Sequence, residues 1–246
     1  MHEHAAKQHH SYSVDTVEEP FATIFQDHFL FQQHGMIDEY IDAYPHVMAW
    51  AKKIVLGSDY GDFFEFLQFL LRHKDSSEQF SRDLDAALSR ARSAYRVVDK
   101  WTIAPFLSIE EGAAIAAAFE ATRKGGFAGT RKHLSDASEA ATAGQWAVSI
   151  NASIDSVEAV CKAISGESTI SKALEVLAPQ ISMHKALKAG LQKIYDFTSN
   201  EKGLRHSLAD LAKANVDEHD AMLMLGTCAA FVSYLIARGR GAGLLS

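Results

Sequence analysis

A long apolar run near the C-terminus limits the possible fold more than any other feature of the sequence. Residues 221–237 read AMLMLGTCAAFVSYLIA, with only Gly226, Thr227, Ser233 and Tyr234 as interruptions. The run falls short of the roughly 20 residues that a helix needs to cross a bilayer. A helix that is apolar on nearly all sides is typical of the buried centre of a bundle. We therefore expect a soluble, all-α helical bundle around this helix, with no membrane association.

Composition narrows the class of protein. The chain has 246 residues, is 48% hydrophobic and carries a formal charge of -7. Such a chain can bury one large core or two modest ones, and its acidity argues against a broad electrostatic grip on duplex nucleic acid. Cys161 and Cys228 lie in apolar helical patterns, so we expect two buried free thiols in a reducing compartment. The N-terminus lacks the apolar core of a signal peptide, which favours a cytoplasmic protein.

The pattern of helix signals predicts how the chain is organised. Residues 1–19 hold four histidines without an acidic or cysteine partner at ligand spacing, so a disordered arm is favoured over a metal-binding tail. We expect an N-terminal helical region over 20–104, a second helical domain over 105–238 and a flexible tail over 239–246. The helices expected from apolar spacing cover residues 21–34, 36–55, 62–73, 76–98, 108–123, 129–143, 146–165, 169–177 and 183–196, followed by a last helix capped by Asn215 or Asp217 and closing near residues 238–239.

A polar island between the last two apolar stretches is the main candidate for a site. Residues 198–206 read TSNEKGLRH, a density of polar side chains for which folding alone has little use. Arg205 offers a permanently charged donor fork suited to phosphate, and His206 can carry a proton near neutral pH. Together they are the minimum for metal-independent RNA cleavage, in which a base deprotonates the ribose 2′-OH and a cation stabilises the phosphorane.

Structural explanations compete with that hypothesis. Neighbours on a regular helix point about 100° apart, so Arg205 and His206 reach one phosphate only at a helix end or across two chains. Arg205 could instead pair with Glu201, Asp196 or Asp210, and His206 could bond a helix terminus.

Other polar residues around the island also allow two interpretations. Thr198 and Glu201 have capping-box spacing, which would account for the TSNE run without any function. In the functional interpretation, Glu201 and Asn200 orient the site, while Thr198, Ser199 and Lys202 contact substrate. His219 could transfer protons to or from the island, although its acidic neighbours are also typical of a helix N-terminus. The lysines at 185, 188 and 193 form a basic edge that could steer an RNA backbone or simply be solvated.

The sequence contains no recognisable metal or cofactor motif. It has no closely spaced cysteine pairs, no His-Glu-x-x-His, no Gly-x-Ser-x-Gly and no Gly-rich phosphate loop followed by Lys-Ser/Thr. We therefore expect no metal and no cofactor.

The C-terminal part resembles a known family. Residues 150–161 (INASIDSVEAVC), 184–187 (HKAL), 194–206 (IYDFTSNEKGLRH) and the apolar run from 221 are similar to the HEPN-like domain of AbiJ-type bacterial abortive-infection proteins. The resemblance covers roughly residues 108–238. Its most specific part is the pattern matched at Tyr195, Phe197, Thr198, Ser199, Gly203, Arg205 and His206. The first hundred residues resemble no family that we can name.

The resemblance implies a helical bundle that pairs through a two-fold interface, and an antiviral or toxin role as a metal-independent endoribonuclease. The usual signature of these enzymes is Arg, four to six residues, then His, whereas here Arg205 is followed at once by His206. Two hypotheses follow. One is a homodimeric ribonuclease of phage defence, with Arg205, His206 and Glu201 as catalytic residues. The alternative is a non-catalytic sensor or adaptor module that binds a protein of the defence system or a nucleotide.

Overall fold

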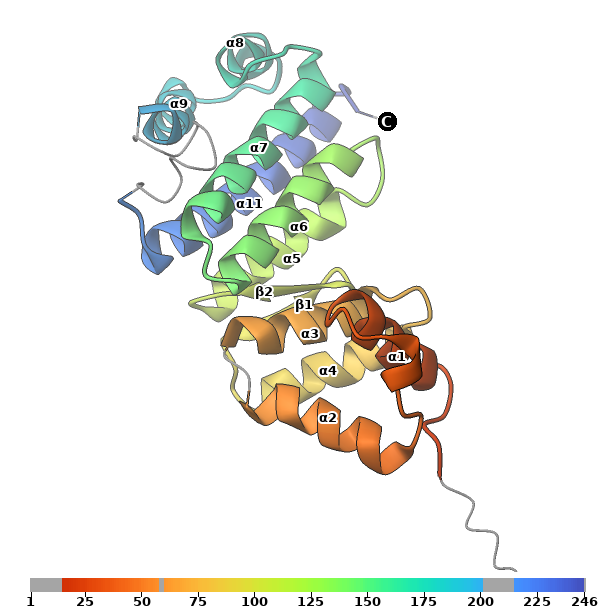
Figure 1. Cartoon of the computed structure of the whole chain (residues 1–246). Helices are drawn as coiled ribbons and strands as arrows, with labels where there is room; N and C mark the ends of the chain where they lie inside the picture. The colour runs from red at the N-terminus through yellow and green to blue at the C-terminus, as the bar shows by residue number, and fades with distance from the viewer. Residues whose placement is uncertain (1–14, 58–59, 201–214, 246) are drawn as a thin grey trace, which may run out of the picture. The chain divides into compact units, whose positions relative to one another are not determined.

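A computed structural model describes residues 15–57, 60–200 and 215–245, with side chains described up to residue 197 in the second of these ranges. Within these residues the chain forms ten α-helices, one short 3-10 helix and one two-stranded sheet (Figure 1). The expected all-α class is confirmed. The chain divides into two compact units, Met1–Ser76 and Ser77–Ser246. The division falls earlier than residue 104, where the sequence suggested a boundary.

The first unit is built on aromatic packing. Its elements are α1 (Phe21–Phe31), η1 (Ile37–Glu39), α2 (Tyr44–Gly57) and α3 (Tyr60–Arg72). Phe25 of α1 stacks on Phe66 of α3 with ring centroids 6.3 Å apart and meets Trp50 of α2 edge-on at 6.0 Å. Offset and edge-on ring pairs of this kind add to the free energy gained from burial. The predicted helix over 36–55 was wrong at its start, because only residues 37–39 form a 3-10 turn before α2 begins at Tyr44.

A histidine lies inside this aromatic core. The His28 side chain is buried, and its ring centroid is 4.8 Å from Phe66, 5.0 Å from Phe69 and 5.4 Å from Trp50. Its Nδ1 atom has no hydrogen-bond partner among the described residues. Burial lowers the pKa of His28 from 6.5 to about 4, because a charged imidazolium would lose its hydration there. The core therefore holds the neutral ring.

We predict that acid destabilises the first unit through His28. Because the folded pKa is depressed, the neutral ring contributes stability above the unfolded pKa of 6.5, and this contribution is lost as the pH falls toward 4. As the pH falls from 6.5 to 4, the free energy of unfolding of the wild type should decrease by about 3 kcal/mol more than that of His28→Phe. Urea unfolding followed by tryptophan fluorescence at a series of pH values measures the difference. His46→Gln, at an exposed position of α2, is the control. Parallel pH profiles for wild type and His28→Phe would contradict the prediction.

The second unit contains the larger core. Its elements are α4 (Glu78–Arg90), β1 (Tyr95–Val98), β2 (Thr102–Pro105), α5 (Ile109–Ala121), α6 (Ala128–Thr142), α7 (Trp146–Ser165), α8 (Ile170–Gln180), α9 (Lys185–Asn200) and α11 (Glu218–Gly241). The predicted start and end of α7 are confirmed. Figure 1 shows α5, α6, α7 and α11 running side by side as a bundle, with α8 and α9 beside α7.

The prediction of one continuous helix over residues 76–98 was wrong. The helix α4 ends at Arg90, and the chain turns through Arg92, whose φ of 52° cannot continue a right-handed helix. Residues 95–98 then form β1, which pairs antiparallel with β2 in a register that places Val98 opposite Thr102. The β-branched side chains of Val97 and Val98 favour a strand over a helix.

The apolar run identified in the sequence is the centre of the second unit. Leu225, Cys228, Val232 and Leu235 of α11 have no exposed surface, and α11 packs against α7, α5 and α6. The helix is 24 residues long with a mean hydropathy of 1.6 in its most apolar window, so length and composition alone would allow a membrane span, contrary to the expectation from the shorter run. Half of that window is buried inside the unit.

Helix termini follow local sequence signals. The Ser108 hydroxyl accepts a hydrogen bond from the Glu111 amide at 3.1 Å and so caps the start of α5. The Glu111 carboxylate accepts a hydrogen bond from the Leu107 amide at 2.7 Å. It therefore provides a partner for the backbone N–H of the residue before the cap. Asp217 caps α11 by accepting from the amides of His219 and Asp220.

A glycine in α11 permits the close approach of α5. A Cβ added at Gly226 would lie 2.9 Å from the Cγ and Oε1 atoms of Glu111. The Glu111 side chain is held by its bond to Leu107, so it cannot turn away without losing that bond. Gly190 of α9, in contrast, has no atom within 4 Å of the same position.

We predict opposite effects for two Gly→Ala changes. Gly190→Ala should raise the free energy of unfolding by about 0.5–1 kcal/mol, because alanine restricts the unfolded chain and suits a helix. Gly226→Ala should lower it by about 1 kcal/mol, because the steric conflict with Glu111 outweighs that gain. Chemical denaturation of both variants measures the difference. Equal stabilisation by the two changes would show that α5 and α11 do not meet closely at this point.

Candidate functional site

The polar island begins in the last turn of α9 and precedes α11 in the chain. The helix α9 ends at Asn200 and α11 begins at Glu218. Thr198, Ser199 and Asn200 form the end of α9, so Thr198 does not begin a helix and the capping box expected there was wrong. The candidate residues Glu201, Lys202, Arg205 and His206 lie outside the described residues. The structure thus gives the two helix ends that border the island.

The helix α9 is attached to the core along one side. Leu191 is buried, and Ile194 and Tyr195 pack partly against the core, while Phe197 remains 39% exposed. This arrangement leaves the last described turn of α9 beside solvent. Tyr195 therefore acts in packing, and Phe197 is the aromatic side chain of this helix that a ligand could reach.

The basic edge expected on α9 is partly neutralised. Lys185 and Lys193 are exposed and Lys188 is half-buried. The ammonium of Lys193 lies 3.3 Å from the Asp196 carboxylate, which also accepts from the Gln192 amide. These two hydrogen bonds lower the pKa of Asp196. Two of the three lysines remain to attract a polyanion.

The α11 side of the island is acidic. The His219 side chain is 80% exposed, with its Nδ1 atom 3.8 Å from a carboxylate oxygen of Asp217. Glu218 and Asp220 occupy the same first turn. Carboxylates stabilise a helix N-terminus through the helix dipole, and here they also repel phosphate. His219 therefore suits proton transfer better than phosphate binding.

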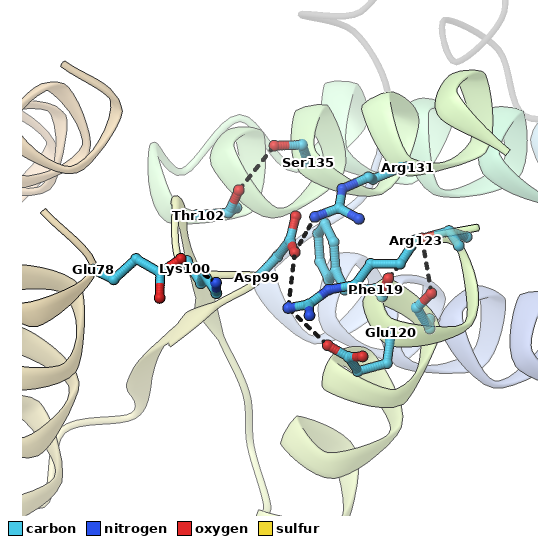
Figure 2. A network of polar contacts seen from close by, with 11 residues as sticks. Glu78, Asp99, Lys100, Thr102, Phe119, Glu120, Arg123, Arg131 and Ser135 are labelled. Atoms are coloured by element: carbon cyan, nitrogen blue, oxygen red, sulfur yellow. Dashed lines mark hydrogen bonds and ion pairs between the residues drawn. The ribbon is translucent and has the colours of Figure 1, made fainter. Parts of the chain in front are cut away.

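Sequence reasoning missed a polar network around the tip of the β-hairpin, which Figure 2 shows in close view. Asp99 follows β1, and its side chain is 7% exposed. Its carboxylate forms an ion pair with Arg131 of α6 and lies 4.0 Å from the guanidinium of Arg123, which follows α5. Arg123 also pairs with Glu120 at 2.8 Å. The network joins the hairpin to two helices that come later in the chain.

Local backbone geometry explains why an aspartate stands at this position. Asp99 and Lys100 have φ values of 56° and 68°, a left-handed conformation that aspartate tolerates better than most side chains. The turn directs Asp99 toward α6 and Lys100 toward Glu78 of α4, with which Lys100 forms an ion pair (Figure 2). Beside the turn, the Thr102 hydroxyl lies 3.0 Å from that of Ser135.

The Asp99 network has the properties of a structural element. Its four members, Asp99, Glu120, Arg123 and Arg131, carry two negative and two positive charges, so it presents no net charge to a ligand. Burial raises the pKa of Asp99, although the neighbouring Arg131 opposes that shift. The network fixes the hairpin tip against α6 at an electrostatic cost, as buried ion pairs commonly do.

Metal ligands do not gather in the part of the chain that the structure describes: no group of three or more His, Cys, Asp or Glu side chains is placed to hold an ion. Both cysteines are buried free thiols, as expected, and burial raises the pKa of each to about 12. Neither thiol is suited to nucleophilic chemistry, because only the thiolate attacks.

Comparison of the chain with models of protein families, with curated proteins and with solved structures found no match.

We predict that Asp99→Asn becomes more stable relative to wild type as the pH rises. Because the folded pKa of Asp99 is raised, the folded chain holds this proton more tightly than the unfolded chain does. The resulting stability is present below the unfolded pKa and is lost as the pH rises through the folded pKa. Asparagine keeps the left-handed backbone and does not titrate. Urea unfolding from pH 3 to pH 7 measures the trend, and the reverse trend would mean that Arg131 outweighs burial.

Proposed function

We propose that this chain is a HEPN-like effector of antiphage defence that acts in the cytoplasm as a homodimeric, metal-independent endoribonuclease. Arg205 holds the scissile phosphate, His206 acts as general base or acid, and Glu201 and Asn200 orient the site. The observation that carries the proposal is the position of the polar island in the chain. The island begins in the last turn of α9 and precedes α11, the helix at the centre of the second unit's core.

This position supports a site for a physical reason. Functional residues gain precision when a rigid scaffold holds the segment that carries them. The helix α11 supplies that rigidity, because its buried side chains pack against three other helices. Substrate contacts would come from Thr198, Ser199, Lys202 and His219. Lys185 and Lys188 of α9, which form no ion pair within the described residues, would attract the RNA backbone.

The acidic start of α11 favours a second candidate function. Asp217, Glu218 and Asp220 lie at the start of α11, the next described helix after the island. The whole chain is acidic, whereas proteins that grip long RNA present basic surface. A non-catalytic adaptor would use the island to bind a protein partner or a nucleotide. Substitution of Arg205 or His206 would then abolish partner binding in a protein that never cleaves RNA.

The test is cleavage of total cellular RNA by the purified full-length chain in excess chelator. The wild type should cleave, and His206→Ala and Arg205→Ala should each lose about 10²–10⁴-fold in rate. The rate should depend on pH in a bell shape if His206 transfers a proton. His46→Ala, an exposed histidine of the first unit, is the control and should cleave like wild type. Cleavage that chelator abolishes, or that survives both substitutions, would sink the mechanism.

A further inference from the structure

The first unit contains a pocket that the proposed function does not use. It has a volume of about 480 Å³ and is lined by the extended residues 16–18 and by side chains of α1 and α2. This volume falls in the range of ligand pockets, roughly 300–1,000 Å³. The lining residues are Thr16, Val17, Glu18, Phe21, Phe25, Tyr44 and Met48.

The floor and one wall of the pocket are apolar and well supported. Phe25 is 7% exposed and stacks on Phe66, so it is fixed by the unit's own core. Phe21 contacts Phe25 with ring centroids 6.0 Å apart. Tyr44 is 51% exposed, and its backbone amide donates to the Asp15 carbonyl at 2.7 Å. That bond joins the segment before α1 to the start of α2.

The surroundings of the pocket are acidic. Glu18 belongs to its lining, and the exposed Asp15 and Glu19 flank it in the chain. Residues 15–57 carry seven carboxylates (15, 18, 19, 27, 38, 39 and 42) against two lysines (52 and 53). Burial raises the pKa of Tyr40 to about 12, and the charges of Asp42 and Glu19 add to this shift.

Apolar lining and acidic rim together define a chemical class of ligand. An RNA or another polyanion would be repelled by these carboxylates. A basic, amphipathic peptide segment fits this combination, because its apolar side chains match the aromatic lining and its lysines or arginines complement the carboxylates. Such segments commonly dock in hydrophobic grooves between helices, and complementary charge speeds and directs their association.

We propose that this pocket is a docking site for a basic amphipathic segment of a partner protein. Phe21, Phe25, Tyr44 and Met48 hold the apolar anchor, and Glu18 with its acidic neighbours selects for positive charge. The inference does not depend on ribonuclease activity, because the site lies in the first unit and the polar island in the second.

The probe for this site is a fluorescent synthetic peptide of leucine and lysine with helical amphipathic spacing. Two control peptides separate the contribution of charge from that of apolar contact. One has glutamate in place of lysine, and the other has serine in place of leucine. Fluorescence anisotropy with the full-length wild type should show binding of the first peptide only. The affinity should fall with rising salt, because exposed charges are screened.

Three variants locate the binding. Tyr44→Ser and Glu18→Lys should each weaken binding about tenfold, since they remove an apolar contact and reverse a rim charge. Tyr44→Phe should bind like wild type. The matched control is Glu65→Lys, which makes the same change of charge at an exposed position of α3 and should alter affinity less than about twofold. Far-UV circular dichroism and urea unfolding verify that each variant folds.

Several outcomes would overturn the proposal. They are absence of binding by wild type, equal binding of the glutamate peptide, and equal weakening by Glu65→Lys and Glu18→Lys. Self-association of the chain that Tyr44→Ser abolishes would assign the surface to a second copy instead. RNA cleavage measured in parallel keeps the two proposals separate, because Tyr44→Ser should leave cleavage unchanged and His206→Ala should leave peptide binding unchanged.

Discussion

Burial of α11 against α7 and α5 is the interaction on which the second unit depends. The side chains of Leu225, Cys228 and Val232 have no exposed surface, and such burial contributes roughly 25 cal/mol per Å² of apolar area removed from water. Close contact is possible because Gly226 has no side chain where α5 passes, next to Glu111. This packing fixes the position of α11, the next described helix after the polar island. A substitution that loosened α11 would therefore disturb the candidate site without touching it.

Electrostatics play different roles in the two units. The Asp99 network joins the hairpin to α6 through charges that cancel within the network. Glu18 in the pocket lining and its neighbours Asp15 and Glu19 are exposed, and residues 15–57 carry seven carboxylates against two lysines, so this segment has a net negative charge. Buried and balanced charges are typical of structural positioning, whereas an exposed excess of one sign directs association with partners. This contrast is the reason to assign docking to the first unit.

The sequence predicted helix bounds correctly where glycines flank a segment with apolar residues at helical spacing. The helix α7 follows Gly144 and ends at Gly166, two residues with positive φ, and its predicted bounds are confirmed. The β-hairpin was missed because apolar residues at helical spacing (Leu88, Ala91 and Tyr95) continue past the end of α4 at Arg90. Its turn also contains no glycine, although Asp99 and Lys100 adopt positive φ.

The candidate site could be predicted only in part, for a related reason. Chain position identified the polar island, but α9 extends to Asn200, inside the island, whereas the sequence predicted that this helix ends at residue 196. The Asp99 network and the acidic pocket depend on residues from distant segments, such as Asp99 with Arg131 or Glu18 with Tyr44. Spacing along the chain carries no information about such pairs, because tertiary packing brings them together.

The measurement that tests the account most directly is ultraviolet cross-linking of cellular RNA to the full-length chain, with the linked peptides mapped by mass spectrometry. If the polar island binds RNA, cross-links should concentrate in the peptides that span residues 185–219, and excess of unlabelled RNA should compete for them. Phe197, the exposed aromatic side chain of α9, is the residue expected to link most readily. Cross-links confined to other parts of the chain, or their complete absence, would contradict a ribonuclease site at the island.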